Sequence, residues 1–220
     1  MRFLLLAFPA AFVLCLCVPA GSRGGAPRSY CISCRGGDDA NPGTREAPWR
    51  SLDKLHASWE LIGPGDSVLF RRGDLFAPGR VGERIGLITI PNRKAGTAAM
   101  PIVVGAYGNG ERPVISGENC TEYHQALRTG SLAHIEIREL EFRGYVVFRA
   151  GDDTTAGIRN LRLHRLKLQG GIDTLSTTKI QFSNPYAPSR VPLPNRAAPI
   201  DKVEISFCEF FDTEGEDALN

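Results

Sequence analysis

The sequence lacks a strong charge bias, and beyond its first twenty residues it lacks a long hydrophobic run. Its 220 residues carry 26 basic and 24 acidic side chains, and no basic block is longer than the pair Arg71 and Arg72. A chain with so little net charge has no strong electrostatic attraction for a nucleic acid or an anionic membrane, so we expect neither as the main partner. A membrane-spanning helix needs about 18 uninterrupted apolar residues, and no such stretch occurs, so we also expect no membrane span.

The first twenty residues have the features of a signal peptide. Arg2 is a minimal positive region, residues 3–18 are apolar with one proline, and Val18, Pro19 and Ala20 form a small-residue cleavage site before Gly21. The sequence therefore predicts a signal peptide over residues 1–20, a short linker over 21–29 and one domain over 30–220. We expect a secreted protein, either extracellular or periplasmic.

Beyond the signal peptide the chain has four cysteines, and it lacks the second closely spaced pair that a zinc site needs. Cys31 and Cys34 have zinc-like spacing, but Cys120 and Cys208 stand alone. If residues 30–33 form a strand, Cys31 and Cys34 point to opposite faces, which is poor geometry for one ion. A role in strand packing or in a disulfide is the preferred interpretation, and the pairing of Cys120 with Cys208 stays open.

Internal repetition is the most informative feature of the chain. Residues 134–144 (HIEIRELEFRG), 160–170 (NLRLHRLKLQG) and 202–212 (KVEISFCEFFD) share one pattern of two short alternating runs separated by two residues. Two short strands with one buried face explain every apolar position, whereas an amphipathic helix scatters them around its surface. The aligned apolar positions are Ile135, Ile137, Leu140 and Phe142, then Leu161, Leu163, Leu166 and Leu168, then Val203, Ile205, Cys208 and Phe210.

Repeated units of this kind stack strand on strand in parallel. The step from Ile135 to Leu161 is 26 residues, the size of one coil of a parallel β-helix, and the step from Leu161 to Val203 is 42. The longer step contains an inserted excursion rich in proline, at Pro185, Pro188, Pro192 and Pro194.

One helix is predicted before the strands. Ser51 is a suitable N-cap, and Leu52, Leu55, Trp59 and Ile62 form an apolar stripe at helical spacing. The first coil of a parallel stack has an open edge, and we expect this helix to cover it. Trp59 is then a core residue rather than a platform for a sugar. Further strands are predicted at residues 67–70, 87–90, 101–104 and 113–116.

Residues 30–44 (YCISCRGGDDANPGT), 48–52 (PWRSL), 64–74 (PGDSVLFRRGD) and 101–117 (PIVVGAYGNGERPVISG) resemble the opening of secreted right-handed β-helix proteins of the pectin-lyase-like superfamily. The resemblance implies an all-β right-handed parallel β-helix, a solenoid with an N-terminal capping helix. It departs from the family at the interruptions, Arg138-Glu139, His164-Arg165 and Ser206-Phe207, which lack the stacked asparagines frequent there. The acidic pair Asp38 and Asp39 is read as a turn former rather than a calcium site.

The superfamily contains polysaccharide lyases, pectin hydrolases, epimerases and non-catalytic surface proteins, so the fold alone does not fix a reaction. A lyase needs a base and a cation that neutralises the uronate carboxylate, and a hydrolase needs two carboxylates. His164, Arg165 and Lys167 are the candidate catalytic residues, with Asp173 as a candidate substrate-binding residue. The alternative is that these are ordinary charged positions on the wet face of a strand. His124 and His134 are given no role.

The last residues carry a second cluster of charges. Asp212, Glu214, Glu216 and Asp217 surround a glycine and are candidate calcium ligands or an acid pair, although a solvated acidic turn has the same composition. Ala218 and Leu219 resemble the start of a further strand, and nothing resembles a terminal cap, so we expect a solenoid truncated at its C-terminus. The resemblance to the pectin-lyase-like superfamily implies a carbohydrate-active protein, with a polysaccharide lyase on uronate-containing polymers favoured over a glycoside hydrolase, and we expect a monomer. The alternative is a non-catalytic carbohydrate-binding or surface β-helix.

Overall fold

A computed structural model describes residues 26–77, 86–117, 125–144, 146–150, 157–170, 180–182 and 200–211. The predicted signal peptide and residues 21–25 of the predicted linker lie outside these ranges, as do the proline-rich excursion and Cys120. Within them, no helix is long and apolar enough to cross a membrane.

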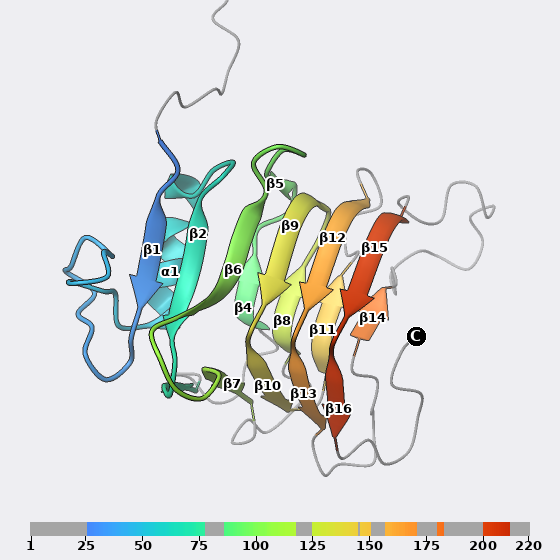
Figure 1. Ribbon diagram of the computed structural model, residues 1–220. Helices are drawn as coiled ribbons and strands as arrows, with labels where there is room; N and C mark the ends of the chain where they lie inside the picture. Colours follow the sequence, from blue (N-terminus) through green and yellow to red (C-terminus); the bar gives the residue numbers. More distant parts are fainter. Residues whose placement is uncertain are drawn as a thin grey trace, which may run out of the picture.

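The described chain is mostly β-structure, arranged in three parallel sheets that we call A, B and C (Figure 1). Sheet A contains β1 (Ser29–Ile32), β2 (Ser67–Arg71), β5 (Lys94–Ala95), β6 (Ile102–Tyr107), β9 (Leu132–Arg138), β12 (Ile158–His164) and β15 (Ile200–Ser206). Sheet B contains β3 (Leu75–Phe76), β7 (Val114–Ser116), β10 (Glu141–Gly144), β13 (Lys167–Gly170) and β16 (Glu209–Phe211). Sheet C contains β4 (Gly86–Ile90), β8 (Gln125–Thr129), β11 (Val146–Ala150) and β14 (Ile180–Phe182).

The chain visits the three sheets in a fixed order. From β9 onward it runs A, B, C, A, B, C, A, B, and each strand pairs in parallel with the strand one round earlier. Parallel pairing of this kind requires a crossover connection between partners, and here the strands of the other two sheets supply it. All three sheets therefore grow along one axis, by one strand per round.

The register of sheet A confirms the predicted repeat. Leu161 lies opposite Ile135 on one side and Val203 on the other, and Leu163 lies opposite Ile137 and Ile205. In sheet B the same alignment joins Phe142, Leu168 and Phe210. The side chains of Ile137 and Leu163 are fully buried. Burial of one such side chain contributes about 1.5–3 kcal/mol, so the stacked apolar columns form the continuous core between the sheets.

The predicted interruption between the two strands of each repeat is a sharp backbone bend. Glu139, Arg165 and Phe207 occupy it with φ of 59°, 51° and 54°, in the left-handed region. Backbone hydrogen bonds continue through the bend, because Glu139 N–H donates to His164 O at 3.2 Å and Arg165 N–H to Ser206 O at 3.0 Å. Peptide groups thus connect the successive bends, which is how the corner forms without the stacked asparagines frequent in the family.

The N-terminal end of the stack has a separate cover for each sheet. The N–H of Cys31 donates to Gly43 O and the N–H of Trp49 to Cys31 O, so the loop between Gly43 and Trp49 pairs with the free edge of β1. Cys34 Sγ donates to Leu75 O at 3.3 Å on the first strand of sheet B. Both cysteines are free thiols, as is Cys208, and burial raises the pKa of all three.

The predicted helix, α1 (Leu52–Ser58), covers the first strand of sheet C. It packs against β4, and His56 Nε2 accepts a hydrogen bond from Thr89 N–H at 3.1 Å. Ser51 caps the helix as predicted, with its hydroxyl accepting from Lys54 N–H. The apolar stripe is buried as predicted, but α-helical geometry ends at Ser58, and a 3-10 turn over Trp59–Leu61 (η1) completes it.

Candidate functional site

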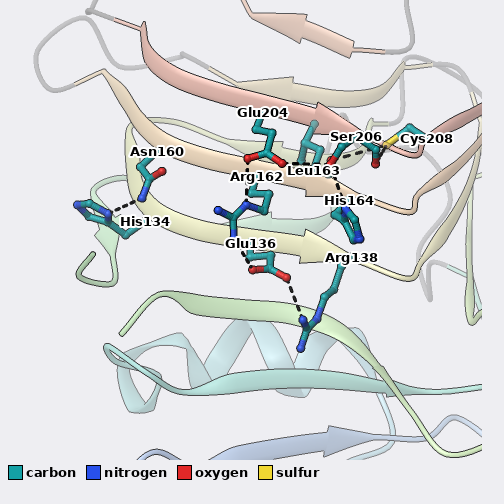
Figure 2. A network of polar contacts seen from close by, with 10 residues as sticks. All are labelled: His134, Glu136, Arg138, Asn160, Arg162, Leu163, His164, Glu204, Ser206 and Cys208. Carbon is teal, nitrogen blue, oxygen red and sulfur yellow. Dashed lines mark hydrogen bonds and ion pairs between the residues drawn. The ribbon is translucent and has the colours of Figure 1, made fainter. Parts of the chain in front are cut away.

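A ladder of charged side chains crosses the outer face of sheet A (Figure 2). Arg162 of β12 lies between two carboxylates on the neighbouring strands, with Nη1 3.3 Å from Glu136 Oε2 and Nε 3.3 Å from Glu204 Oε2. Glu136 also binds Arg138 at 3.0 Å. The alternation of charge follows from the register, because these residues face each other on adjacent strands. Exposed pairs of this kind contribute at most about 1 kcal/mol each, so the ladder sets the charge pattern of this face more than its stability.

His164 lies beside this ladder on the same face. Its Nδ1 is 2.9 Å from Ser206 Oγ (Figure 2). Its ring also meets the ring of Phe207 edge-on, with the ring centres 5.3 Å apart. Ser206 in turn donates to Glu204 at 3.3 Å. The imidazole is thereby held in one orientation, and its pairing with a hydroxyl suits it to move a proton.

Arg165 occupies the bend between sheets A and B and belongs to a different cluster. Glu139 accepts from Arg72 Nη2 at 2.8 Å and from Arg165 Nη1 at 3.3 Å, so one carboxylate joins two arginines from bends of different rounds. Burial alone would raise the pKa of Glu139, but the hydrogen bonds from Arg72 and Arg165 outweigh it and hold that pKa below its usual value.

Lys167 is on the outer face of sheet B. Its Nζ is 3.6 Å from Glu141 Oε2 and lies 5.0 Å from the centre of the Phe211 ring. The three predicted catalytic residues therefore occupy sheet A, the bend and sheet B in turn. The structure places them around one corner, each with its own partners, and does not bring them into a common cavity.

The remaining candidate residues fall on parts of the chain that the structure does not describe. These are Asp173 and the acidic cluster Asp212, Glu214, Glu216 and Asp217. Among the residues it does describe, no group of three or more His, Cys, Asp or Glu is arranged to hold a metal ion.

The acidic pair near the N-terminus has a structural role. Asp39 accepts from the N–H groups of Arg50 and Ser51, both at 2.9 Å, and from Ser51 Oγ at 2.6 Å. Asp38 accepts from Ala40 N–H at 2.9 Å, which is an Asx-turn. The two carboxylates organise the loop and the start of α1.

His134, which the sequence left without a role, has a partner one round away. Its Nδ1 is 2.9 Å from Asn160 Nδ2, and both residues have left-handed φ, 53° and 49° (Figure 2). Lys202 continues the column with φ of 52°. A second line of bent residues therefore runs parallel to the corner line, and it does contain an asparagine.

Sequence reasoning missed one feature, a cavity of about 510 Å³ where the N-terminal loop meets the end of sheet A. Arg45 and Glu46 of the loop form one wall, and Arg71, Arg72 and Tyr107 form the other. These residues are far apart in the sequence. The pairing of β2 with β6, which places Arg71 opposite Tyr107, brings the second wall together. The signal in the sequence was only indirect, since Arg71 directly follows the strand predicted at residues 67–70 and Tyr107 lies three residues beyond the one predicted at 101–104.

Comparison with known proteins gives a local sequence match and a wider match of fold, and no family model matches the chain. A lacto-N-biosidase of Bifidobacterium longum subsp. longum is 40% identical over 91 residues, which is 40% of this chain and 5% of that protein. The solved structure of a GH136 lacto-N-biosidase from Eubacterium ramulus matches 85% of this chain and 35% of its own, with a TM-score of 0.53 and 20% identity. An alginate lyase from a Paenibacillus species matches 87% of this chain and 61% of its own, with a TM-score of 0.51 and 14% identity. The chain thus spans only a small part of the curated relative and about a third of the solved lacto-N-biosidase.

Proposed function

We propose that this chain is the N-terminal part of a secreted carbohydrate-active enzyme built on a right-handed parallel β-helix of the pectin-lyase-like kind. The observation that carries the proposal is the 91-residue stretch that is 40% identical to a lacto-N-biosidase. The order in which the chain visits the three sheets supports the solenoid. The apolar N-terminal segment supports secretion, and the covered first edge supports a monomer, since it blocks end-to-end pairing there.

Hydrolysis of a glycosidic bond is the reaction that this relative favours over elimination. Hydrolysis needs two carboxylates of which one is protonated and one is charged. On the outer face of sheet A, Glu136 and Glu204 both form ion pairs with Arg162, so their oxygens are already engaged. We therefore propose that the acid pair comes from the cluster Asp212, Glu214, Glu216 and Asp217. Calcium binding is the alternative role of this cluster.

Elimination from a uronate polymer remains the second candidate. The observations that favour it are the imidazole of His164, held by Ser206, and the guanidinium of Arg165, which follows it in the chain at the bend between sheets A and B. A lyase needs such a base and such a cation.

The two reactions are separated by their products. We expect the full protein to release a chromophore from a chromogenic lacto-N-bioside and to give no rise in ultraviolet absorbance with alginate or pectate. Absorbance from unsaturated products would favour the lyase instead. Binding of the oligosaccharide without any product would contradict both and leave a non-catalytic binding protein.

Calcium binding by the acidic cluster has its own measurement. We expect calcium to bind in calorimetry and Asp217→Asn to weaken that binding. Unchanged affinity in the variant would exclude a role for Asp217 as a ligand.

A further inference from the structure

We propose that the cavity lined by Arg45, Arg71, Arg72 and Tyr107 is a binding subsite for a negatively charged sugar residue, one that carries a carboxylate or a sulfate. The inference rests on the proposed function only in taking the ligand to be a carbohydrate. It adds a site at the N-terminal end of the stack, lined by none of the predicted catalytic residues.

The charge of the cavity is the first argument. Three arginines line it, against the single carboxylate of Glu46. Glu139 neutralises Arg72. The guanidinium groups of Arg45 and Arg71 form no ion pair with any residue that the structure describes, in contrast to Arg138, Arg162 and Arg165 on the neighbouring strands. Two cations without carboxylate partners, converging on one concavity, form a site for an anion.

The rigidity of the cavity is the second argument. Arg71 and Tyr107 end paired strands of sheet A, so their backbones are fixed by the sheet. Arg72 is held by Glu139 on one side, and its Nη1 donates to Gly110 O at 3.4 Å. The opposite wall belongs to the loop whose backbone pairs with β1. Because the backbone of such a site is already ordered, binding a ligand there costs little conformational entropy.

Tyr107 supplies a flat apolar face and a hydroxyl group. Arg45 lies 5.9 Å from the centre of its ring, within the range of a cation–π contact. Burial, with a smaller effect of the Cys31 thiol, raises the pKa of Tyr107 to about 12, so its hydroxyl remains a hydrogen-bond donor at neutral pH. The volume of the cavity, about 510 Å³, falls within the range of pockets that bind small molecules, which agrees with binding of one sugar residue.

The cavity lies at one end of a continuous polar corner. Glu139 connects Arg72 to Arg165, which follows β12, and β12 is three strands along sheet A from β2. Parallel strands are about 4.8 Å apart, so the backbones of β2 and β12 are separated by roughly 14 Å, which a short sugar chain lying across the strands can span. A polymer bound in this direction places an anionic residue in the cavity and later residues beside His164.

The test is equilibrium binding of the full chain to three tetrasaccharides, measured by calorimetry at low salt. The probes are a galacturonate tetrasaccharide, a sulfated heparin-derived tetrasaccharide and the neutral lacto-N-tetraose. We expect one of the anionic probes to bind more tightly than the neutral one, and the better of the two identifies the charged group. Loss of one charge-assisted contact in Arg71→Gln or Arg45→Gln should weaken that binding by about tenfold.

Arg50→Gln is the matched control, because it removes the same charge from an exposed arginine at the same end of the molecule, outside this cavity. Equal weakening by Arg50→Gln and Arg71→Gln, or equal binding of neutral and anionic probes, would overturn the proposal. The outcome is independent of bond cleavage. Binding that depends on Arg71 can occur in a protein with no activity, and activity can occur without it.

Discussion

At the scale of single residues, the least expected feature is the use of bulky side chains at left-handed backbone positions. An ion pair joins Glu139 of one round to Arg165 of the next, and this contact offsets the conformational strain of both residues. Phe207 cannot form an ion pair, its side chain is 76% exposed, and its ring meets the His164 ring edge-on. A left-handed conformation costs roughly 1–2 kcal/mol for most residues and much less for asparagine.

We therefore expect Phe207→Asn to stabilise the protein by about 1 kcal/mol, measured as a higher urea midpoint. The matched control is Phe211→Asn, which removes an exposed phenylalanine from the regular backbone of β16. That control should be neutral or destabilising. A gain in both variants would show that lost surface hydrophobicity, and not backbone strain, is responsible.

At the scale of elements, α1 takes the place of a strand at the start of sheet C. Its contact with β4 depends on a neutral His56, because Nε2 must accept the Thr89 N–H. Burial lowers the pKa of His56 below its ordinary value of 6.5, with Asp53 acting weakly in the opposite direction. Below about pH 6.5 the unfolded chain therefore binds this proton before the folded chain does, and stability falls as the pH falls.

We expect the unfolding midpoint of the wild-type protein to fall between pH 7.5 and pH 5.5 by more than that of His56→Gln. The glutamine carbonyl can accept the same hydrogen bond without titrating. His56→Ala should cost about 0.5–1.5 kcal/mol at pH 7.5, because it removes the hydrogen bond between Thr89 N–H and the imidazole. Identical pH dependence in the wild-type and glutamine proteins would show that other groups carry it.

The sequence predicted the strands of sheets A and B except the two-residue β3 and β5, and it predicted the register of the three aligned repeats, because each repeat places alternating apolar residues inward, such as Leu161 and Leu163. It predicted only β4 of sheet C. Strand β14 has only three residues, and β8, although as long as β4, offers one buried apolar residue among its described side chains, Leu127, too little for a pattern of period two. The stripe ending at Ile62 suggested a longer helix, but Gly63 and Pro64 follow, and the chain closes with a 3-10 turn.

The predicted site was accessible to sequence reasoning in part. His164, Arg165 and Lys167 are neighbours in the chain, but the bend at Arg165 turns them outward in different directions, and a bend in the left-handed region has no distinct signature when glycine and asparagine are absent. The arginine cavity combines residues 45, 71 and 107, which only strand stacking brings together. The residues of this cavity are identified by the register of the paired strands and not by a sequence motif.

At the scale of the molecule, each round contacts mainly the rounds before and after it, so damage should stay local. We expect Leu163→Ala to destabilise the protein by about 2–5 kcal/mol, because its side chain is fully buried. Loss of hydrogen-exchange protection should be greatest in β9, β12 and β15 and least in β1 and β2. Arg162→Ala, the outward-facing neighbour, should change stability by less than about 1 kcal/mol. Uniform loss of protection along the stack would indicate a single cooperative unit instead.

The two lines of left-handed residues also have a consequence for engineering. In the last three rounds they are five residues apart, at 134 and 139, 160 and 165, and 202 and 207, and in these rounds the passage from sheet A to sheet B keeps one length, with two residues between the strands. The step between rounds grows from 26 to 42 residues while the alignment of both sheets is kept, so the additional chain enters only on the two sides of sheet C. The longer round thus shows where the fold accepts inserted residues. A grafted peptide or displayed epitope belongs in the connections that flank sheet C, and the corner between sheets A and B serves as the fixed frame of such a scaffold.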